Sequence, residues 1–136
     1  MRFGYGYLHR SRLAPFIQLD SALAGHTQPA PPKCNVHRKN YWIYTQATAK
    51  PTITVMQDLS ETSGGAYWGE VNANMHKGLG SQGVITNGTV RDLPEVRALG
   101  VFHFFAGGVH VSHGWAHLED FNRPAKFSVC LRTLAI

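Results

Sequence analysis

The sequence lacks the features that mark several common classes of protein. Its two cysteines, Cys34 and Cys130, lie far apart and form neither a metal-binding spacing nor a disulfide framework, so a reduced setting is expected. The longest apolar stretch is interrupted by His103 and His110 and is too short to span a membrane. The N-terminus has no apolar core that suits a signal peptide. We therefore expect a cytoplasmic protein with no membrane partner.

A dense run of Lys and Arg is also lacking, although the net charge is +5. The excess lies in residues 1–40, which carry six basic side chains and one acidic side chain, whereas the remaining residues carry seven of each. Without a dense basic run, the charge argues against nucleic-acid binding. We interpret residues 1–39 as a poorly organised basic segment and expect the folded domain over residues 40–136.

Signals for strands and helices alternate along that domain. The expected strands, short runs of β-branched and aromatic residues, cover residues 52–56, 84–85, 101–105, 109–111, 115–121 and 126–129. The expected helices cover residues 40–49, 66–77 and 93–99. In the first helix the apolar face includes Trp42, Ile43 and Ala47, and in the second Val71 and Met75 lie four residues apart. This alternation predicts an α/β fold.

Three glycines spell a G-x-G-x-x-G motif at Gly78, Gly80 and Gly83. The dinucleotide fingerprint requires a strand before these glycines and a helix after them. Here the predicted order is helix, glycines, strand. We interpret the glycines as a helix end followed by a turn.

Three histidines, His110, His113 and His117, resemble a metal cluster. Gly114 breaks any helix that would align them, and in a strand the first two would face opposite sides. Packed or surface histidines are therefore the better interpretation, and a zinc site is the lesser alternative.

The stretch from Gly83 to Glu95 predicts a strand, a turn, a charged pair and a helix start. Asp92 and Glu95 have the spacing of a capping box. On this local pattern alone, Asp92 caps the helix and Arg91 faces water. The alternative is that the pair holds an organic acid and a cation at the helix N-terminus, where backbone N–H groups and the dipole favour anions.

Gly69 and Glu70 form a second candidate at the start of the expected helix over residues 66–77. A glycine there lets backbone N–H groups approach a ligand closely. Glu70 offers a carboxylate that could join Asp92 in binding a hard cation. Taken alone, an ordinary first-turn glutamate is the better interpretation of Glu70.

Taken together, these segments resemble the RraA-like family, which includes regulators of ribonuclease E activity and 4-hydroxy-4-methyl-2-oxoglutarate aldolases. The resemblance rests on AYWGEVNA at residues 66–73, GSQGVITNGTVRDLPE at residues 80–95 and FFA at residues 104–106. Glu70, Arg91, Asp92 and Glu95 match the family motif in order and interval. The resemblance implies a swivelling β/β/α domain, usually assembled as a homotrimer or hexamer. It also implies a copy shortened at both ends, with an incomplete, C-terminally truncated domain.

The resemblance implies a divalent-metal-dependent lyase, with Mg²⁺ or Mn²⁺, that cleaves a small 2-oxo acid to pyruvate by aldol cleavage or oxaloacetate decarboxylation. Backbone N–H groups of Gly69, Glu70, Val71 and Asn72 would bind the substrate carboxylate. Arg91 would pair with the oxo and carboxylate oxygens, Asp92 would hold the metal, and Glu70 would orient water bound to it. The alternatives are a non-enzymatic regulator that binds a ribonuclease and an inactive remnant.

Overall fold

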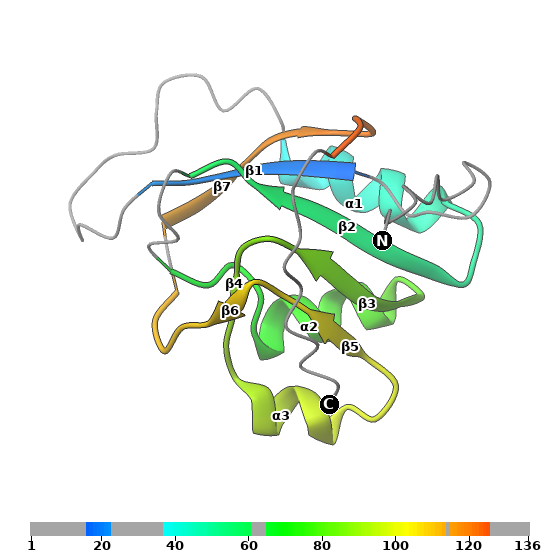
Figure 1. The fold of residues 1–136 in the computed structure, drawn as a ribbon. Helices are drawn as coiled ribbons and strands as arrows, with labels where there is room; N and C mark the ends of the chain where they lie inside the picture. Colours follow the sequence, from blue (N-terminus) through cyan, green and yellow to red (C-terminus); the bar gives the residue numbers. More distant parts are fainter. Residues whose placement is uncertain (1–15, 23–36, 61–64, 114, 126–136) are drawn as a thin grey trace, which may run out of the picture.

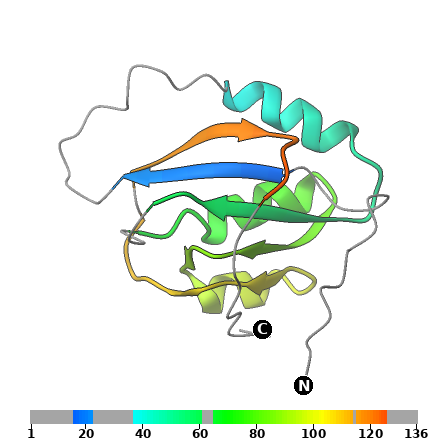
Figure 2. The ribbon, with the colours of Figure 1, turned by 45° about the horizontal axis from the view of Figure 1, so that its top comes forward.

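The computed structural model describes residues 16–22, 37–60, 65–113 and 115–125 (Figure 1). Its main sheet has five strands, β1 (Phe16–Ala22), β2 (Thr52–Asp58), β3 (Ser81–Thr86), β5 (His103–Phe105) and β7 (Trp115–Phe121). Their order across the sheet is β5-β3-β2-β1-β7 (Figure 2). Strand β7 is antiparallel to β1, and the other neighbours are parallel.

Three helices accompany the sheet in the described part of the chain: α1 (Arg38–Ala47), α2 (Glu70–Gly78) and α3 (Leu93–Ala98). Helices α1 and α2 lie on one face of the sheet, and α3 lies near α2 beyond the β5 edge (Figures 1 and 2). A second, parallel pair of short strands joins β4 (Thr89–Val90) to β6 (Gly108–Val109). Parallel strands covered by helices confirm the predicted α/β fold.

The prediction that residues 1–39 are poorly organised is wrong for strand β1. This strand lies between β2 and β7, with Phe16 paired to Val55 and Ile17 paired to Phe121. The sequence there has no clean alternation of apolar and polar residues. A strand with neighbours on both sides is held by backbone hydrogen bonds as well as by its side chains, so a missing period does not exclude it.

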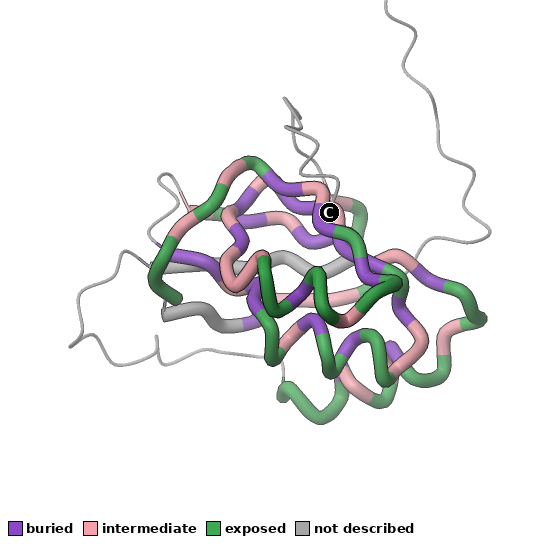
Figure 3. The backbone as a smooth tube through the Cα atoms, turned by 90° about the horizontal axis from the view of Figure 1, so that it is seen from below, coloured by how far each residue is buried: buried purple, intermediate pink, exposed green. Residues whose placement is uncertain are grey.

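Both helices are present, but the predicted apolar face of the first is confirmed only at Trp42, which packs against the core, and that of the second is wrong. In α1 the buried residues are Tyr41 and Thr45, whereas Ile43 is 54% exposed. In α2 Ala73 and His76 are buried, whereas Val71 is 64% exposed. Figure 3 shows the buried segments following the strands and recurring along the inner sides of the helices.

The expected helix over residues 66–77 begins later, at Glu70. Residues before it are extended because Trp68 forms a parallel β-bridge with Val90. The remaining predicted elements appear as β2, β3, β5, β6, β7 and α3, with ends shifted by a few residues. The strand expected over residues 126–129 lies outside the described residues. Within the described part, no helix has the length and apolar character that crossing a membrane requires.

Candidate active site

Three backbone segments run side by side at one end of the small β4–β6 sheet. The Arg91 N–H donates to the Trp68 carbonyl at 2.8 Å on one side of β4. On the other side, the His110 N–H donates to the Val90 carbonyl at 3.0 Å. This arrangement brings the start of α2, the Arg91-Asp92 pair and the end of β6 together from sequence positions about 20 residues apart.

Asp92 occupies the N-cap position of α3 but does not cap that helix with its side chain. Its backbone is left-handed, with φ 57° and ψ 42°. The Oδ2 atom accepts a hydrogen bond from the Glu70 N–H at 3.0 Å, and Oδ1 lies 3.5 Å from the Arg91 guanidinium. The predicted capping box is therefore wrong, because the turned backbone directs the carboxylate to the start of α2 instead.

Gly69 permits this close approach. A Cβ atom built at Gly69 would lie 2.4 Å from Asp92 Oδ2 and 2.9 Å from Arg91 Cγ, both shorter than van der Waals contact. The same contact buries Arg91 Nε, which has no hydrogen-bond partner among the described residues. The Arg91 side chain as a whole stays 29% exposed. A cation that is only partly satisfied and partly open to solvent is suited to bind an anion.

The first turn of α2 adds backbone donors beside this cation. The Glu70 N–H is occupied by Asp92, and the first intrahelical bond runs from the Ala73 N–H to the Gly69 carbonyl at 3.0 Å. The N–H groups of Val71 and Asn72 belong to the orphan set at a helix start, where the dipole also favours negative charge. Neither donates to a backbone carbonyl in the described part of the chain.

The position of this turn is fixed by Asn72 from both sides. The Asn72 side-chain amide donates to the Tyr67 backbone carbonyl at 2.6 Å, and the Asn72 backbone carbonyl accepts from His76 Nδ1 at 2.7 Å. Because a carbonyl only accepts, Nδ1 carries the proton and His76 Nε2 accepts from the Tyr41 hydroxyl at 2.5 Å. Burial lowers the pKa of His76 from 6.5 to about 4 and raises the pKa of Tyr41. The pair is therefore a neutral buried support beneath the site.

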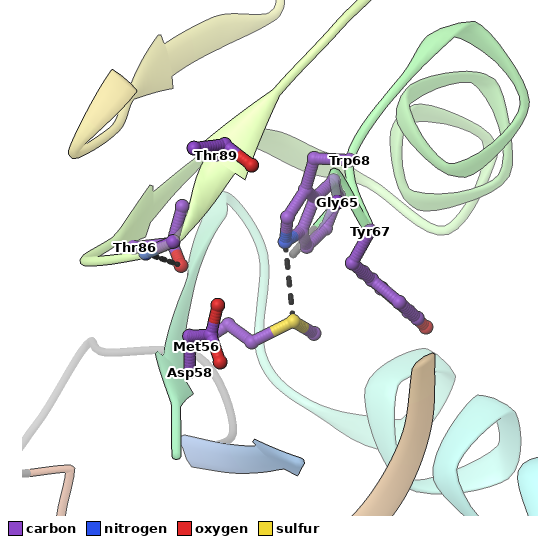
Figure 4. Close-up of a pocket in the computed structure, with 8 residues that line it drawn as sticks. Met56, Asp58, Gly65, Tyr67, Trp68, Thr86 and Thr89 are labelled. Carbon is purple, nitrogen blue, oxygen red and sulfur yellow. Dashed lines mark hydrogen bonds between the residues drawn. The ribbon is translucent and has the colours of Figure 1, made fainter. Parts of the chain in front are cut away.

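Trp68 anchors the segment that precedes α2. It is 1% exposed, its ring centroid lies 4.4 Å from that of His76, and its Nε1–H points to Met56 Sδ at 3.1 Å (Figure 4). The cavity beside it has a volume of about 10 Å³, enough for roughly one water molecule. Asp58 and Thr86 also line this cavity (Figure 4). It is too small for an organic substrate.

A larger open depression, with a volume of about 320 Å³, lies on the outer side of Arg91 and Asp92. Its third polar residue is His110. The Ser112 N–H donates to His110 Nδ1 at 3.2 Å, which helps to hold the imidazole in place. This volume suits a small organic acid. In the sequence, His110 stands out only as a member of a possible zinc cluster, because its position beside Arg91 depends on the pairing of β6 with β4.

The donor set fits a hard cation only in part. The described residues contain no group of three His, Cys, Asp or Glu side chains that could hold a metal ion. Asp92 offers one carboxylate at the edge of the depression, beside the partly satisfied cation Arg91. Mg²⁺ keeps several waters and is often bound by one or two carboxylates together with substrate oxygens. A divalent cation bound jointly by Asp92 and a substrate is consistent with this set.

The structure brings most of the predicted site residues to one place. Asp92 contacts the Glu70 N–H and the Arg91 guanidinium, Gly69 packs against both Arg91 and Asp92, and Val71 and Asn72 complete the same turn of α2. Glu95 lies exposed in the first turn of α3 and does not line the depression. The three-histidine zinc hypothesis finds no support among the described side chains, and the His117 side chain lies outside them.

Comparisons with known proteins identify the family and the fold. A family model described as RraA-like (Aldolase/RraA) matches residues 33–131. A crystal structure described as that of novel cellulases from microbes associated with the gut ecosystem has a TM-score of 0.62 and 13% sequence identity, and the match covers 90% of this chain and 51% of that one. At this identity the likeness shows the fold alone.

A second crystal structure is that of Streptomyces coelicolor RraAS2, described as an unusual member of the RNase ES inhibitor RraA protein family. The match has a TM-score of 0.46 and 18% identity and covers 77% of this chain and 47% of that one. At this TM-score the match does not by itself establish a shared fold. The chain spans about half the length of both solved structures. No curated protein matches the chain.

Proposed function

Because the chain belongs to the RraA-like family, we propose that it is a divalent-metal-dependent lyase that cleaves small 2-oxo acids to pyruvate. The observation that carries the proposal is the meeting of Arg91, Asp92 and the start of α2 beside an open depression. Positive charge, helix N–H groups and one carboxylate there suit an anionic substrate and a cation. Aldol cleavage of 4-hydroxy-2-oxo acids and decarboxylation of oxaloacetate both belong to this chemistry.

Substrate binding is assigned to the groups that the fold leaves unsatisfied. The α2 N–H groups of Val71 and Asn72 donate hydrogen bonds to the substrate carboxylate, and Arg91 pairs with the carboxylate and 2-oxo oxygens. Arg91 rests on Gly69 and is held at 3.5 Å from Asp92 Oδ1, so its position is fixed before substrate binds. Such preorganisation lets the guanidinium stabilise negative charge without reorganising during the reaction.

The reaction places that charge on the 2-oxo group. In aldol cleavage the C3–C4 bond breaks, the C4 hydroxyl loses its proton and becomes a carbonyl, and the bonding pair leaves the enolate of pyruvate. In decarboxylation of oxaloacetate the same enolate forms as CO₂ departs. The enolate then takes up a proton at C3 to give pyruvate. Arg91 supplies fixed positive charge where the enolate oxygen develops.

We propose Mg²⁺ or Mn²⁺ as the cofactor, with Asp92 as its protein ligand and Glu70 as a nearby carboxylate that orders water. When bound, the cation supplies Lewis-acid stabilisation of the negative charge on the 2-oxo group. Asp92 has a second task in the chain itself, since its Oδ2 already fixes the Glu70 N–H. Its carboxylate therefore couples the position of α2 to the cation.

We further propose that the active form is a homotrimer or a pair of trimers. Val71 and Met75 place apolar side chains on the outer face of α2, 64% and 42% exposed. Apolar side chains on a helix face beside the site are suited to contact another subunit. Light scattering coupled to size exclusion tests the assembly, and a folded monomer at micromolar concentration would contradict it.

The function is tested by pyruvate release from oxaloacetate and from 4-hydroxy-4-methyl-2-oxoglutarate. We expect turnover above the metal-only background with added Mg²⁺ or Mn²⁺, loss of turnover in EDTA, and recovery when metal is restored. Asp92→Asn keeps an oxygen acceptor for the Glu70 N–H, so we expect this variant to fold. It lacks the negative charge that the cation requires, so we expect it to be inactive. Turnover that does not depend on metal would contradict the proposal. Absence of turnover by a folded protein would also contradict it.

A further inference from the structure

The depression beside Arg91 has two chemically different parts. Arg91, Asp92 and His110 form the polar part. The remaining described lining is apolar and consists of Leu93, Pro94, Val109 and Val111. Leu93 and Pro94 come from the first turn of α3, whereas the valines come from β6 and the residues after it. The two sources face a shared space of about 320 Å³.

The apolar part is open to a ligand. Val109 is 50% exposed and Val111 is 95% exposed. Val90 pairs with Val109 in parallel strands, so the residues that follow them, Arg91-Asp92 and His110-Val111, leave the small sheet at the same end. A small molecule whose carboxylate is held by Arg91 therefore extends from the polar part toward these valines.

The charge of the lining limits which chemical group of the ligand can lie against the valines. Arg91 is the sole Lys or Arg among the described lining residues, and the proposed function already uses it for the first carboxylate and the 2-oxo oxygen. A second carboxylate placed against valine, leucine and proline would lose water without gaining a cationic partner. A methyl group in the same place would instead remove apolar surface from water.

We infer that the preferred substrates are 4-hydroxy-2-oxo monocarboxylic acids with a short aliphatic group at C4, and that Val109 and Val111 are the specificity-determining residues. This inference rests on the proposed lyase function and names the substrate class of that site. Cleavage breaks the C3–C4 bond and gives pyruvate and a small ketone or aldehyde. The proton of the C4 hydroxyl balances the proton taken up by the pyruvate enolate.

Two substrates that differ at one group test the inference. 4-Hydroxy-4-methyl-2-oxopentanoate carries two methyl groups at C4, and 4-hydroxy-4-methyl-2-oxoglutarate carries one methyl and one carboxylate. We expect kcat/KM with Mg²⁺ to favour the monoacid by about tenfold, the scale of one group in an apolar pocket. Release of acetone identifies cleavage of the monoacid. Cleavage of the diacid yields two molecules of pyruvate, so its measured pyruvate is divided by two to give the number of turnovers.

Val111→Arg adds a cation to the wall at an exposed position, so it should fold and shift the preference toward the diacid by about tenfold or more. Val101→Arg is the matched control, because Val101 is 62% exposed and does not line the depression. We expect it to leave the preference unchanged. Equal shifts in both variants would overturn the role of Val111.

Inhibition of oxaloacetate turnover provides a second measurement that needs no aldol cleavage. 2-Oxopentanoate and 2-oxoglutarate differ only by a methyl or a carboxylate at the far end, and we expect the monoacid to inhibit more strongly. Preference for the diacid in either assay overturns the inference and leaves the lyase function standing. If oxaloacetate shows no turnover above background, the proposed function fails and the inference fails with it.

Discussion

The carboxylate of Asp92 caps helix α2, which begins 22 residues earlier, and not helix α3, which it precedes. Its Oδ2 accepts the Glu70 N–H at 3.0 Å. Gly69, at the N-cap position of α2, has no side chain to do this. One carboxylate thus ties the two segments of the proposed site together, and its removal should affect stability and activity separately.

Replacing Asp92 separates these two effects. Asp92→Ala loses the cap, at a cost of about 1 kcal/mol, and places alanine in the left-handed region, at a cost of about 1 kcal/mol more. Asp92→Asn keeps an oxygen acceptor and tolerates φ 57°, so we expect its stability to stay near wild type. Both variants should lose activity. Urea denaturation measures the first effect and pyruvate release the second.

The matched control for Asp92 is Glu95→Ala, the other member of the predicted capping box. Glu95 is exposed in the first turn of α3 and Asp92 does not cap that helix. We expect its free energy of unfolding to change by less than about 0.5 kcal/mol. A larger loss in Glu95→Ala than in Asp92→Ala would restore the capping box and contradict the observed cap.

Gly69→Ala tests the close contact at the start of α2. The added Cβ would lie 2.4 Å from Asp92 Oδ2 and 2.9 Å from Arg91 Cγ, so the charged pair must move. We expect a loss of about 1–3 kcal/mol in stability and at least a tenfold loss in kcat/KM, since small displacements of positioned groups are costly. Gly78→Ala is the control because nothing lies within 4 Å of its Cβ position. Equal behaviour of the two variants would contradict the contact.

His76 should make the stability of the protein depend on pH. Burial lowers its folded pKa from 6.5 to about 4, so between these values the unfolded chain binds a proton that the folded chain does not. Its contribution is therefore fully present above about pH 6.5 and is lost as the pH falls toward 4. The shift corresponds to about 3 kcal/mol.

Urea denaturation at pH 7 and pH 4.5 measures this contribution. We expect His76→Gln to be less stable at pH 7 and to lose less stability on acidification than the wild type. His113→Gln is the control, because His113 is exposed. An acid-induced loss of the same size in wild type and His76→Gln would mean that other groups cause it.

The alternation of strands and helices was sufficient to predict the α/β fold, because β2 and β5 are rich in the β-branched and aromatic residues typical of strands. It was not sufficient to predict which side of each helix is buried. Val71 and Met75 have helical spacing, yet α2 buries Ala73 and His76 because the His76 ring finds partners in Tyr41 and Asn72. A buried histidine with both nitrogens bonded has no signature in an apolar pattern.

Strand β1 was missed for a related reason, since Phe16–Ala22 pairs on both sides and does not alternate. Within the proposed site, Glu70, Arg91 and Asp92 were predicted from the family resemblance by their order and interval, and the structure places them side by side. The bond from Asp92 to Glu70 was not, because it depends on the left-handed backbone at Asp92. His110 and Val111 were not placed beside them because only the pairing of β4 with β6 brings them there.

In the proposed reaction, Arg91 binds the substrate and stabilises the charge that forms. The most direct test is kcat/KM for oxaloacetate with saturating Mg²⁺, corrected for the metal-only rate, in wild type, Arg91→Ala and Arg97→Ala. Arg97 is an exposed arginine in the last turn of α3 and does not line the depression. We predict a loss of about a hundredfold or more in Arg91→Ala and wild-type rates in Arg97→Ala. Equal rates in Arg91→Ala and wild type would contradict the account.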